Sequence, residues 1–275
     1  MSENPKRLLK TKIMGIINAN DDSFFENSRF KGADAIHKIN SMIKDGADII
    51  DIGGVSTKPG SLAISDKEEL QRIAPICDII KEQKLYEKVS FSIDSYTPSV
   101  IKYALESGFT IVNDITGLEN DKIALLVAKY DATIIIMHMK GKPKNMQENP
   151  TYKNVIAEVH AFFAQRIETA KKFGIKKIII DVGIGFGKTL EHNLMLLKNM
   201  DKFLDLDCQI LIAASRKSMI DKITPSLVEE RLSGTLAIHL DSVKKGATLV
   251  RCHDVKEHYQ ALKVQESIDS ITSSL

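Results

Sequence analysis

Cysteine is scarce in this sequence, and the few cysteines present follow no pattern. There are three cysteines, an odd number, and they lie far apart without C-x-x-C spacing: Cys77, Cys208 and Cys252. This arrangement indicates neither a disulfide framework nor a zinc site. A reducing compartment fits best, so we expect a cytoplasmic protein.

An excess of charge and a long apolar run are also lacking. The chain of 275 residues carries 38 basic and 36 acidic side chains, a net charge of +2, so charge favours neither nucleic acid nor an anionic membrane as a partner. No apolar run approaches the roughly 18 residues of a membrane span, and residues 1–10 lack the apolar core of a signal peptide. No linker or low-complexity segment divides the chain. We therefore expect one domain, residues 1–275, with a core of roughly 12–272.

Short apolar runs rich in β-branched residues recur along the chain, and we interpret them as strands. They occupy residues 12–18, 48–52, 89–93, 110–113, 133–137, 177–181, 209–213 and 248–251. Between them lie stretches with the 3.6-residue period of amphipathic helices, for example 33–44, 66–81, 98–107, 154–173 and 225–245. This alternation predicts an α/β protein, a (β/α)8 TIM barrel in a single domain. A doubly wound sheet is the alternative.

One of these runs leads directly into an acid and three alternating glycines. Asp181 stands at the end of the apolar run, and the glycines that follow permit positive φ and close approach of a ligand to the backbone: Gly183, Gly185 and Gly187. Lys188 and Thr189 match the end of a phosphate-binding P-loop, but Val182 replaces that motif's first glycine. A dinucleotide-binding fingerprint fails because its third glycine comes one residue early. A tight turn without a ligand is the simpler alternative.

Polar side chains recur where the other predicted strands end. Functional residues of a barrel gather at the carboxyl ends of its strands. Helix capping is the simpler role for Ser95, Asp114 and Asp254, and a structural role is the simpler one for His138. Asn18 and Asp51 also stand at strand ends. What favours a site is the convergence of two carboxylates, an amide and a lysine on one end of the predicted barrel, with two further polar residues beside them: Asp94, Asp181, Asn113 and Lys217, with Arg251 and His253.

The chemistry of these side chains suggests two ligand groups. Two carboxylates, an amide and an amine suit a flat heterocycle with donors and acceptors on its edge: Asp94, Asn113, Asp181 and Lys217. Arg251, His253 and Lys58 form a separate cationic group, as a polyphosphate would require. The Asn- and Asp-rich segment 18–22 suggests Mg²⁺, which binds a few protein oxygens together with phosphate oxygens and water.

At these residues the sequence resembles the dihydropteroate synthases. The resemblance runs from Ile13 to Val255 and covers most of the chain. Its motifs are Gly15-Ile-Ile-Asn18 with Asp22-Ser-Phe24, Ile50-Asp-Ile-Gly-Gly54 with Ser56-Thr57 and Pro59-Gly60, Ser92-Ile-Asp94-Ser95, Val112-Asn-Asp-Ile115, Met137-His-Met139, Asp181 with Gly183-Ile-Gly-Phe-Gly-Lys188, Ser215-Arg-Lys-Ser218, and Arg251 with His253-Asp254-Val255.

The resemblance implies a transferase of folate biosynthesis. Such an enzyme condenses 6-hydroxymethyl-7,8-dihydropterin pyrophosphate with 4-aminobenzoate to give 7,8-dihydropteroate and pyrophosphate, with Mg²⁺ as cofactor. Members of the family are commonly homodimers and are sulfonamide targets, so by analogy we expect a homodimer acting on small molecules.

The resemblance also implies residue roles. The pterin would be bound by Asp94, Asn113, Asp181 and Lys217 and enclosed by Ile115, Met137 and Phe186. The pyrophosphate would be bound by Asn18, Thr57, Lys58, Arg251 and His253, and the metal by Asn18 and Asp22. The 4-aminobenzoate would meet Phe24, Pro59 and Ser218. The catalytic residues would be Asp94, Asp181, Lys217, Arg251 and His253.

The chain departs from the family pattern at three places. Residues 18–26 lack a proline and a threonine, Val182 replaces a common proline, and Lys58 stands where the family has an arginine. A lysine cannot reproduce the bidentate phosphate contact of arginine. Residues 23–29 resemble the loop of sulfonamide-insensitive synthases, so sulfonamide sensitivity stays open. The altered loop leaves a catalytically silent pterin-binding paralogue as an alternative. A pterin-dependent methyltransferase of the same fold is another, but it would not use the Arg251 and His253 group.

Overall fold

The computed structural model describes residues 11–19, 33–55 and 64–271, and these form a barrel of eight parallel strands. Each strand pairs with its neighbours in the sequence, and the last pairs with the first, which closes the barrel. This confirms the predicted (β/α)8 barrel and excludes the doubly wound sheet. Every strand boundary lies within one residue of the prediction: β1 (Lys12–Asn18), β2 (Ile49–Gly53), β3 (Ser90–Asp94), β4 (Ile111–Asp114), β5 (Thr133–Met137), β6 (Ile178–Asp181), β7 (Gln209–Ile212) and β8 (Leu249–Cys252).

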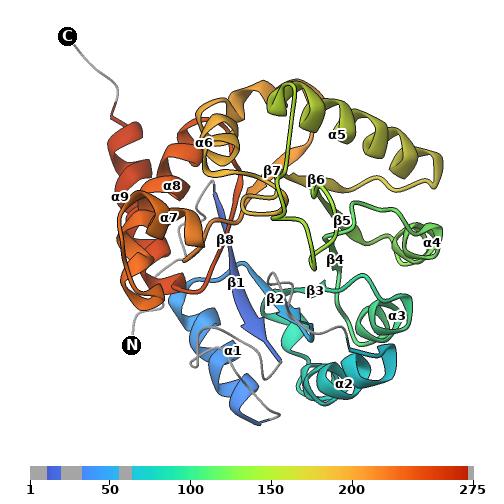
Figure 1. The fold of residues 1–275 in the computed structure, drawn as a ribbon. Coiled ribbons are helices and arrows are strands. Elements are labelled where there is room, and N and C mark those ends of the chain that lie inside the picture. Colours follow the sequence, from blue (N-terminus) through green and yellow to red (C-terminus); the bar gives the residue numbers. More distant parts are fainter. Residues whose placement is uncertain (1–10, 20–32, 56–63, 272–275) are drawn as a thin grey trace.

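Helices surround the barrel in chain order (Figure 1). They are α1 (Ala33–Asp45), α2 (Asp66–Glu82), α3 (Pro98–Glu106), α4 (Asp121–Lys129), α5 (Val155–Lys172), α6 (Leu190–Lys198), α7 (Ser218–Ile223), α8 (Leu232–Lys244) and α9 (Val255–Asp269), with short 3-10 helices η2 (Leu85–Glu87), η3 (Met200–Leu206) and η4 (Val228–Arg231). Among the described helices, none is long and apolar enough to cross a membrane.

One helix prediction was too long. Residues 225–245 were expected to form a single helix, but η4 precedes α8, and residues 225–227 lie outside both. Side chains hold this segment in a non-helical path. Ser226 donates its backbone N–H to Asp221 Oδ1 at 3.0 Å, and its carbonyl oxygen accepts from Arg231 Nη2 at 2.9 Å.

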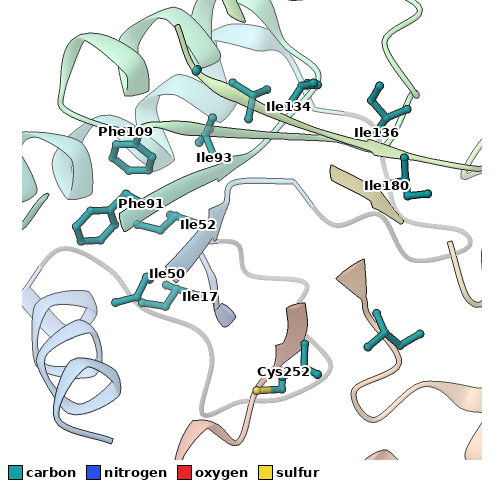
Figure 2. Close-up of a cluster of buried hydrophobic side chains, with 14 of the residues drawn as sticks. Ile17, Ile50, Ile52, Phe91, Ile93, Phe109, Ile134, Ile136, Ile180 and Cys252 are labelled. Carbon is teal, nitrogen blue, oxygen red and sulfur yellow. The ribbon is translucent and has the colours of Figure 1, made fainter. Parts of the chain in front are cut away.

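Alternate strand residues face the surrounding helices and form the larger apolar core. Buried isoleucines dominate this layer, with Phe91 and Phe109 packed at 5.4 Å between ring centroids. Figure 2 shows part of it, including Ile50, Ile52 and Ile93. Each such side chain contributes roughly 1.5–3 kcal/mol of burial free energy. Burial of this layer therefore determines which face of every strand packs against the helices and which face points into the barrel.

The other alternate residues fill the inside of the barrel. A second apolar cluster consists of Met14, Ile49, Ile111, Ile135, Ile179, Leu211, Ala213 and Leu249. Because side chains of a strand alternate, the residue two positions further on faces the same interior. Asp51 follows Ile49 in this way, Asn113 follows Ile111, Met137 follows Ile135, Asp181 follows Ile179, and Arg251 follows Leu249. The polar groups thus lie at the carboxyl mouth of the barrel, next to the apolar cluster that fills its interior.

The opposite, amino mouth holds an open cavity of about 1050 Å³, lined by Lys12, Asp48 and Ser90 among others. Lys12 and Ser90 are exposed, and Asp48 is half-buried. The buried ionisable groups of the strand interiors lie at the carboxyl mouth instead. We therefore place the candidate site at the carboxyl mouth.

Candidate functional site

Arg251 lies between two carboxylates at the carboxyl mouth. Its Nε donates to Asp51 Oδ2 at 2.6 Å, and its Nη2 donates to Asp94 Oδ2 at 2.7 Å. The side chain of Asp51 is 0% exposed, that of Asp94 15% and that of Arg251 18%. The prediction that Arg251 belongs to a separate cationic group is therefore wrong, because Arg251 is bound to one of the predicted pterin carboxylates.

Asp51 also reaches a second predicted site residue. Its Oδ2 accepts from Asn113 Nδ2 at 3.0 Å, within a fully buried contact. The sequence placed Asp51 at a strand end but assigned it no role. The signal that could have revealed one is its position two residues after the interior residue Ile49.

Burial shifts the pKa values of the ionisable groups at this mouth. Burial raises the pKa of Asp94 to about 7, although Arg251 opposes the shift. Burial also raises the pKa of Asp181, against the opposing effects of Lys217 and of a hydrogen bond from the Gly183 N–H at 2.8 Å. Burial lowers the pKa of Lys217 to about 8, although Asp181 favours its charged form. Such shifts are typical of functional sites.

Lys217 and Phe186 lie together beside Asp181. The Lys217 Nζ is 4.5 Å from the Phe186 ring centroid and donates to the Ile184 carbonyl. Ile115 and Met137, predicted to enclose the pterin, are buried at the ends of β4 and β5. Ser218 is exposed and begins α7 directly after Lys217. These elements provide both polar groups and an apolar wall.

Two of the three alternating glycines serve the packing of two loops. Gly183 and Gly187 have φ of 66° and 63°, and a Cβ at either would collide with the carbonyl oxygen of His138 or Lys140. The β6–α6 turn therefore lies directly on the chain that follows β5. This contact explains the requirement for glycine at these two positions without a ligand.

Lys188 is buried under the same turn. Its side chain is among the largest that are fully enclosed, and its Nζ donates to the carbonyls of Gly183 at 3.0 Å, Phe186 at 2.9 Å and His138 at 3.2 Å. Nζ also lies 3.0 Å from His138 Nδ1. A P-loop lysine must reach a phosphate, so this geometry excludes the P-loop interpretation. Burial lowers the pKa of His138 to about 2, which agrees with the expected structural role.

His253 is neutral in this environment. Burial lowers its pKa to about 3, and the nearby Arg251 adds to the effect. The ring Nδ1 lies 2.9 Å from Ser215 Oγ, and the backbone N–H of His253 donates to the same oxygen at 3.2 Å. A pKa this low does not favour the positive charge expected of His253. It can act as a hydrogen-bonding group.

The prediction that Ser95, Asp114 and Asp254 cap helices is wrong, because none of their side chains caps one of the described helices. Asp114 accepts backbone N–H bonds from Thr116 at 2.8 Å and Leu118 at 2.9 Å, so it orders the turn after β4, while Asn120 caps α4. Ser95 accepts the N–H of Thr97 at 3.0 Å. Asp254 makes no side-chain cap and instead binds Arg216 through both of its oxygens, at 2.6 and 3.0 Å.

Some predicted residues lie outside the described part of the chain. They are Asp22 for the metal, Thr57 and Lys58 for the pyrophosphate, and Phe24 and Pro59 for the 4-aminobenzoate. Asn18, assigned to both metal and pyrophosphate, is half-buried at the end of β1. The described part of the site is thus mainly the predicted pterin pocket with Arg251 and His253.

Comparison with known proteins gives consistent matches over nearly the whole chain. Residues 14–253 match the family model described as pterin binding enzyme. The chain is 39% identical over 258 residues to dihydropteroate synthase of Escherichia coli (strain K12), which covers 93% of this chain and 90% of that protein.

Two solved structures agree with these matches. Dihydropteroate synthase of Yersinia pestis with a sulfonamide drug complex has a TM-score of 0.89 at 33% identity, covering 95% of each chain. The enzyme of Thermus thermophilus in complex with 4-aminobenzoate has a TM-score of 0.84 at 32% identity, covering 94% of each chain.

Proposed function

Because the chain belongs to the dihydropteroate synthase family of pterin-binding enzymes, we propose that the carboxyl mouth of its barrel binds 6-hydroxymethyl-7,8-dihydropterin pyrophosphate and 4-aminobenzoate. The enzyme is a transferase that joins them into 7,8-dihydropteroate and releases pyrophosphate. The bond between the pterin methylene carbon and the pyrophosphate oxygen breaks. A bond from the same carbon to the amine nitrogen forms, and the amine loses a proton.

The observation that carries this proposal is the complementarity of four polar side chains to a pterin ring. Ionised Asp94 and Asp181 accept hydrogen bonds, Lys217 donates, and Asn113 can do both. The 2-amino-4-oxo ring of a pterin presents donors and acceptors around one flat edge. Phe186, whose ring lies against Lys217, supplies an apolar surface for the ring face.

The same carboxylates suit the chemistry at the methylene carbon. Departure of pyrophosphate leaves positive charge that the electron-rich dihydropterin ring can delocalise. Asp94 and Asp181, held in a buried site, would stabilise that charge electrostatically without forming a bond to it. No side-chain nucleophile is needed, because the attacking group is the aromatic amine.

Arg251 would bind the leaving pyrophosphate. Its Nε and Nη2 already bond to carboxylates, whereas the described residues give Nη1 no hydrogen-bond partner. Both N–H groups of Nη1 thus remain for phosphate oxygens. His253, being neutral, would add a hydrogen bond rather than a charge.

We propose that Asn18 and Asp22 bind a magnesium ion that arrives with the pyrophosphate. The described residues contain no group of three His, Cys, Asp or Glu that could hold a metal. Mg²⁺ needs only one or two protein oxygens when phosphate oxygens and water complete its shell. The Asn18 carboxamide oxygen is one candidate ligand, and Asp22 would be the second. When bound, Mg²⁺ would neutralise charge on the leaving group.

We also propose a cytoplasmic homodimer. The cysteines are free, and Cys77 and Cys252 are buried as thiols, which supports a reducing compartment. Exposed apolar side chains on α6 and α7, namely Leu194, Met195 and Ile223, support an interface with a second copy. Sedimentation of the purified protein tests this assembly.

The test of the proposed reaction is product formation from the two substrates. Incubation with both should yield 7,8-dihydropteroate and pyrophosphate in equal amounts, measured by liquid chromatography with mass detection. Omission of 4-aminobenzoate should abolish dihydropteroate. Tight pterin binding without any product would instead identify a catalytically silent paralogue.

A further inference from the structure

Asp51 connects the two halves of the site, although it belongs to neither predicted group. From β2 it contacts Arg251 across β1 and Asn113 across β3. Both contacts use Oδ2, at 2.6 and 3.0 Å, and the residue is 0% exposed. The other oxygen, Oδ1, is buried and has no hydrogen-bond partner among the described residues.

We propose that Asp51 is a positioning residue that fixes the polarity of the Asn113 amide and the direction of the Arg251 guanidinium. The inference rests on the proposed function, since it assigns Asp51 a role in discrimination between pterin-like rings. Asp51 itself would not touch the substrate.

The Asn113 amide has one allowed orientation beside the Asp51 carboxylate, which forms an ion pair with Arg251. A carboxylate can only accept hydrogen bonds, so the amide must turn its NH2 group toward Asp51. A flipped amide would place its carbonyl oxygen against Asp51 Oδ2, where two acceptors repel each other. Asn113 therefore offers the ligand its carbonyl oxygen and its second N–H in a fixed order.

Arg251 is fixed in the same way. Two hydrogen bonds, from Nε to Asp51 and from Nη2 to Asp94, set the plane of the guanidinium. If Asp94 were its only partner, the guanidinium could rotate about its single hydrogen bond to that carboxylate. Asp51 thereby holds the Nη1 group of Arg251 in one orientation before any ligand binds.

The unsatisfied Oδ1 argues against a purely stabilising role. Burying a carboxylate oxygen without a donor is unfavourable, and an ion pair at such a depth is often no more stable than an apolar replacement. A buried carboxylate whose second oxygen has no partner among the described residues, yet which holds two ligand-binding side chains, is better explained by what it orients.

The decisive variant is Asp51→Asn in the full-length enzyme. An asparagine at 51 has nearly the same shape, but it can donate to Asn113 and so permits the flipped amide. Calorimetry would measure the affinities for 6-hydroxymethylpterin and for the analogue in which the 2-amino group is replaced by oxygen. We expect the ratio of the two affinities to fall about two- to tenfold, as for loss of one neutral hydrogen bond between Asn113 and the ring.

A matched control is Asp48→Asn. Asp48 directly precedes the same strand at the amino mouth and accepts the Ile13 N–H at 2.9 Å. It is remote from the site, so the affinity ratio should stay unchanged. An unchanged ratio in folded Asp51→Asn would overturn the inference.

A second measurement does not depend on the folding of any Asp51 variant. NMR of the wild-type protein labelled with 15N-asparagine should show one Asn113 side-chain proton that exchanges slowly and is shifted downfield without ligand, assigned by its loss in Asn113→Ala. Fast exchange of both protons would overturn the inference. Wild-type protein that binds no pterin would contradict the proposed function instead, and the NMR result would still show whether Asp51 fixes the Asn113 amide.

Discussion

Asp51 and Arg251 are 200 positions apart in the sequence, yet the carboxylate accepts the guanidinium Nε at 2.6 Å. The same guanidinium binds Asp94. The arginine proposed for the pyrophosphate and an acid proposed for the pterin therefore form one electrostatic unit. A change to any member should affect both halves of the substrate.

Arg251→Gln should show this coupling. Removal of the cation leaves Asp51 buried without its charged partner, so the free energy of unfolding should fall by about 3–5 kcal/mol. Affinity for inorganic pyrophosphate should fall as well. Urea denaturation and calorimetry measure the two effects.

The control for that variant is Arg166→Gln. Arg166 pairs with the largely exposed Glu119 at 3.6 Å on the outer surface, so we expect a change of about 0–1 kcal/mol. Equal losses in the two variants would contradict the coupled arrangement around Arg251.

Activity should have a bell-shaped pH dependence with its maximum between the pKa values of Asp94 and Lys217. As the pH falls through about 7, Asp94 takes up a proton and loses the negative charge that stabilises the pterin. As the pH rises through about 8, Lys217 loses its proton and its positive charge. Both limbs should appear in kcat/KM. Asp94→Asn should lower activity and remove the acidic limb, and persistence of that limb would assign it to another group.

Lys188→Met should destabilise the protein and weaken pterin binding. The substitution leaves the buried carbonyls of Gly183, Phe186 and His138 without their donor, which costs about 1–3 kcal/mol for each group that finds no replacement. Phe186 loses its support in the pocket wall. Thermal denaturation and the KM for the pterin substrate measure these effects. Lys102→Met, on the exposed face of α3, should change neither.

Removal of divalent cations should selectively weaken the binding of one ligand. A chelator should lower the affinity for the pyrophosphorylated pterin and leave that for 6-hydroxymethylpterin unchanged, because only the former carries phosphate oxygens. Added Mg²⁺ should restore binding. Equal affinity of the pyrophosphorylated ligand with and without metal would remove Mg²⁺ from the proposal.

Much of the fold could be predicted because strand periodicity and strand ends are local properties. The run 177–181 predicted β6 to within one residue, and its acid, Asp181, lies at the mouth as expected. Alternation along each strand is equally local. It places Asp94, Asn113 and Arg251 on the interior face.

Contacts and charge states could not be predicted because they depend on how the barrel closes. Asp51 meets Arg251 only after β8 pairs with β1. His253 was expected to be a cation, but its burial, together with the nearby Arg251, lowers its pKa. Lys188 follows a glycine as in a P-loop, and only the packing of the β6–α6 turn on the chain after β5 shows that its amine points inward.

The central claim, that the polar side chains at the carboxyl mouth bind a pterin ring, is tested most directly by titrating 6-hydroxymethylpterin into wild-type protein, Asp181→Asn and the remote control Asp48→Asn. The substitution at 181 exchanges an acceptor for a donor and should lose about 1.5–3 kcal/mol, roughly 10- to 150-fold in affinity. Asp48→Asn should bind as the wild type does. Unchanged affinity in Asp181→Asn would contradict the account, because the ring would then be bound elsewhere.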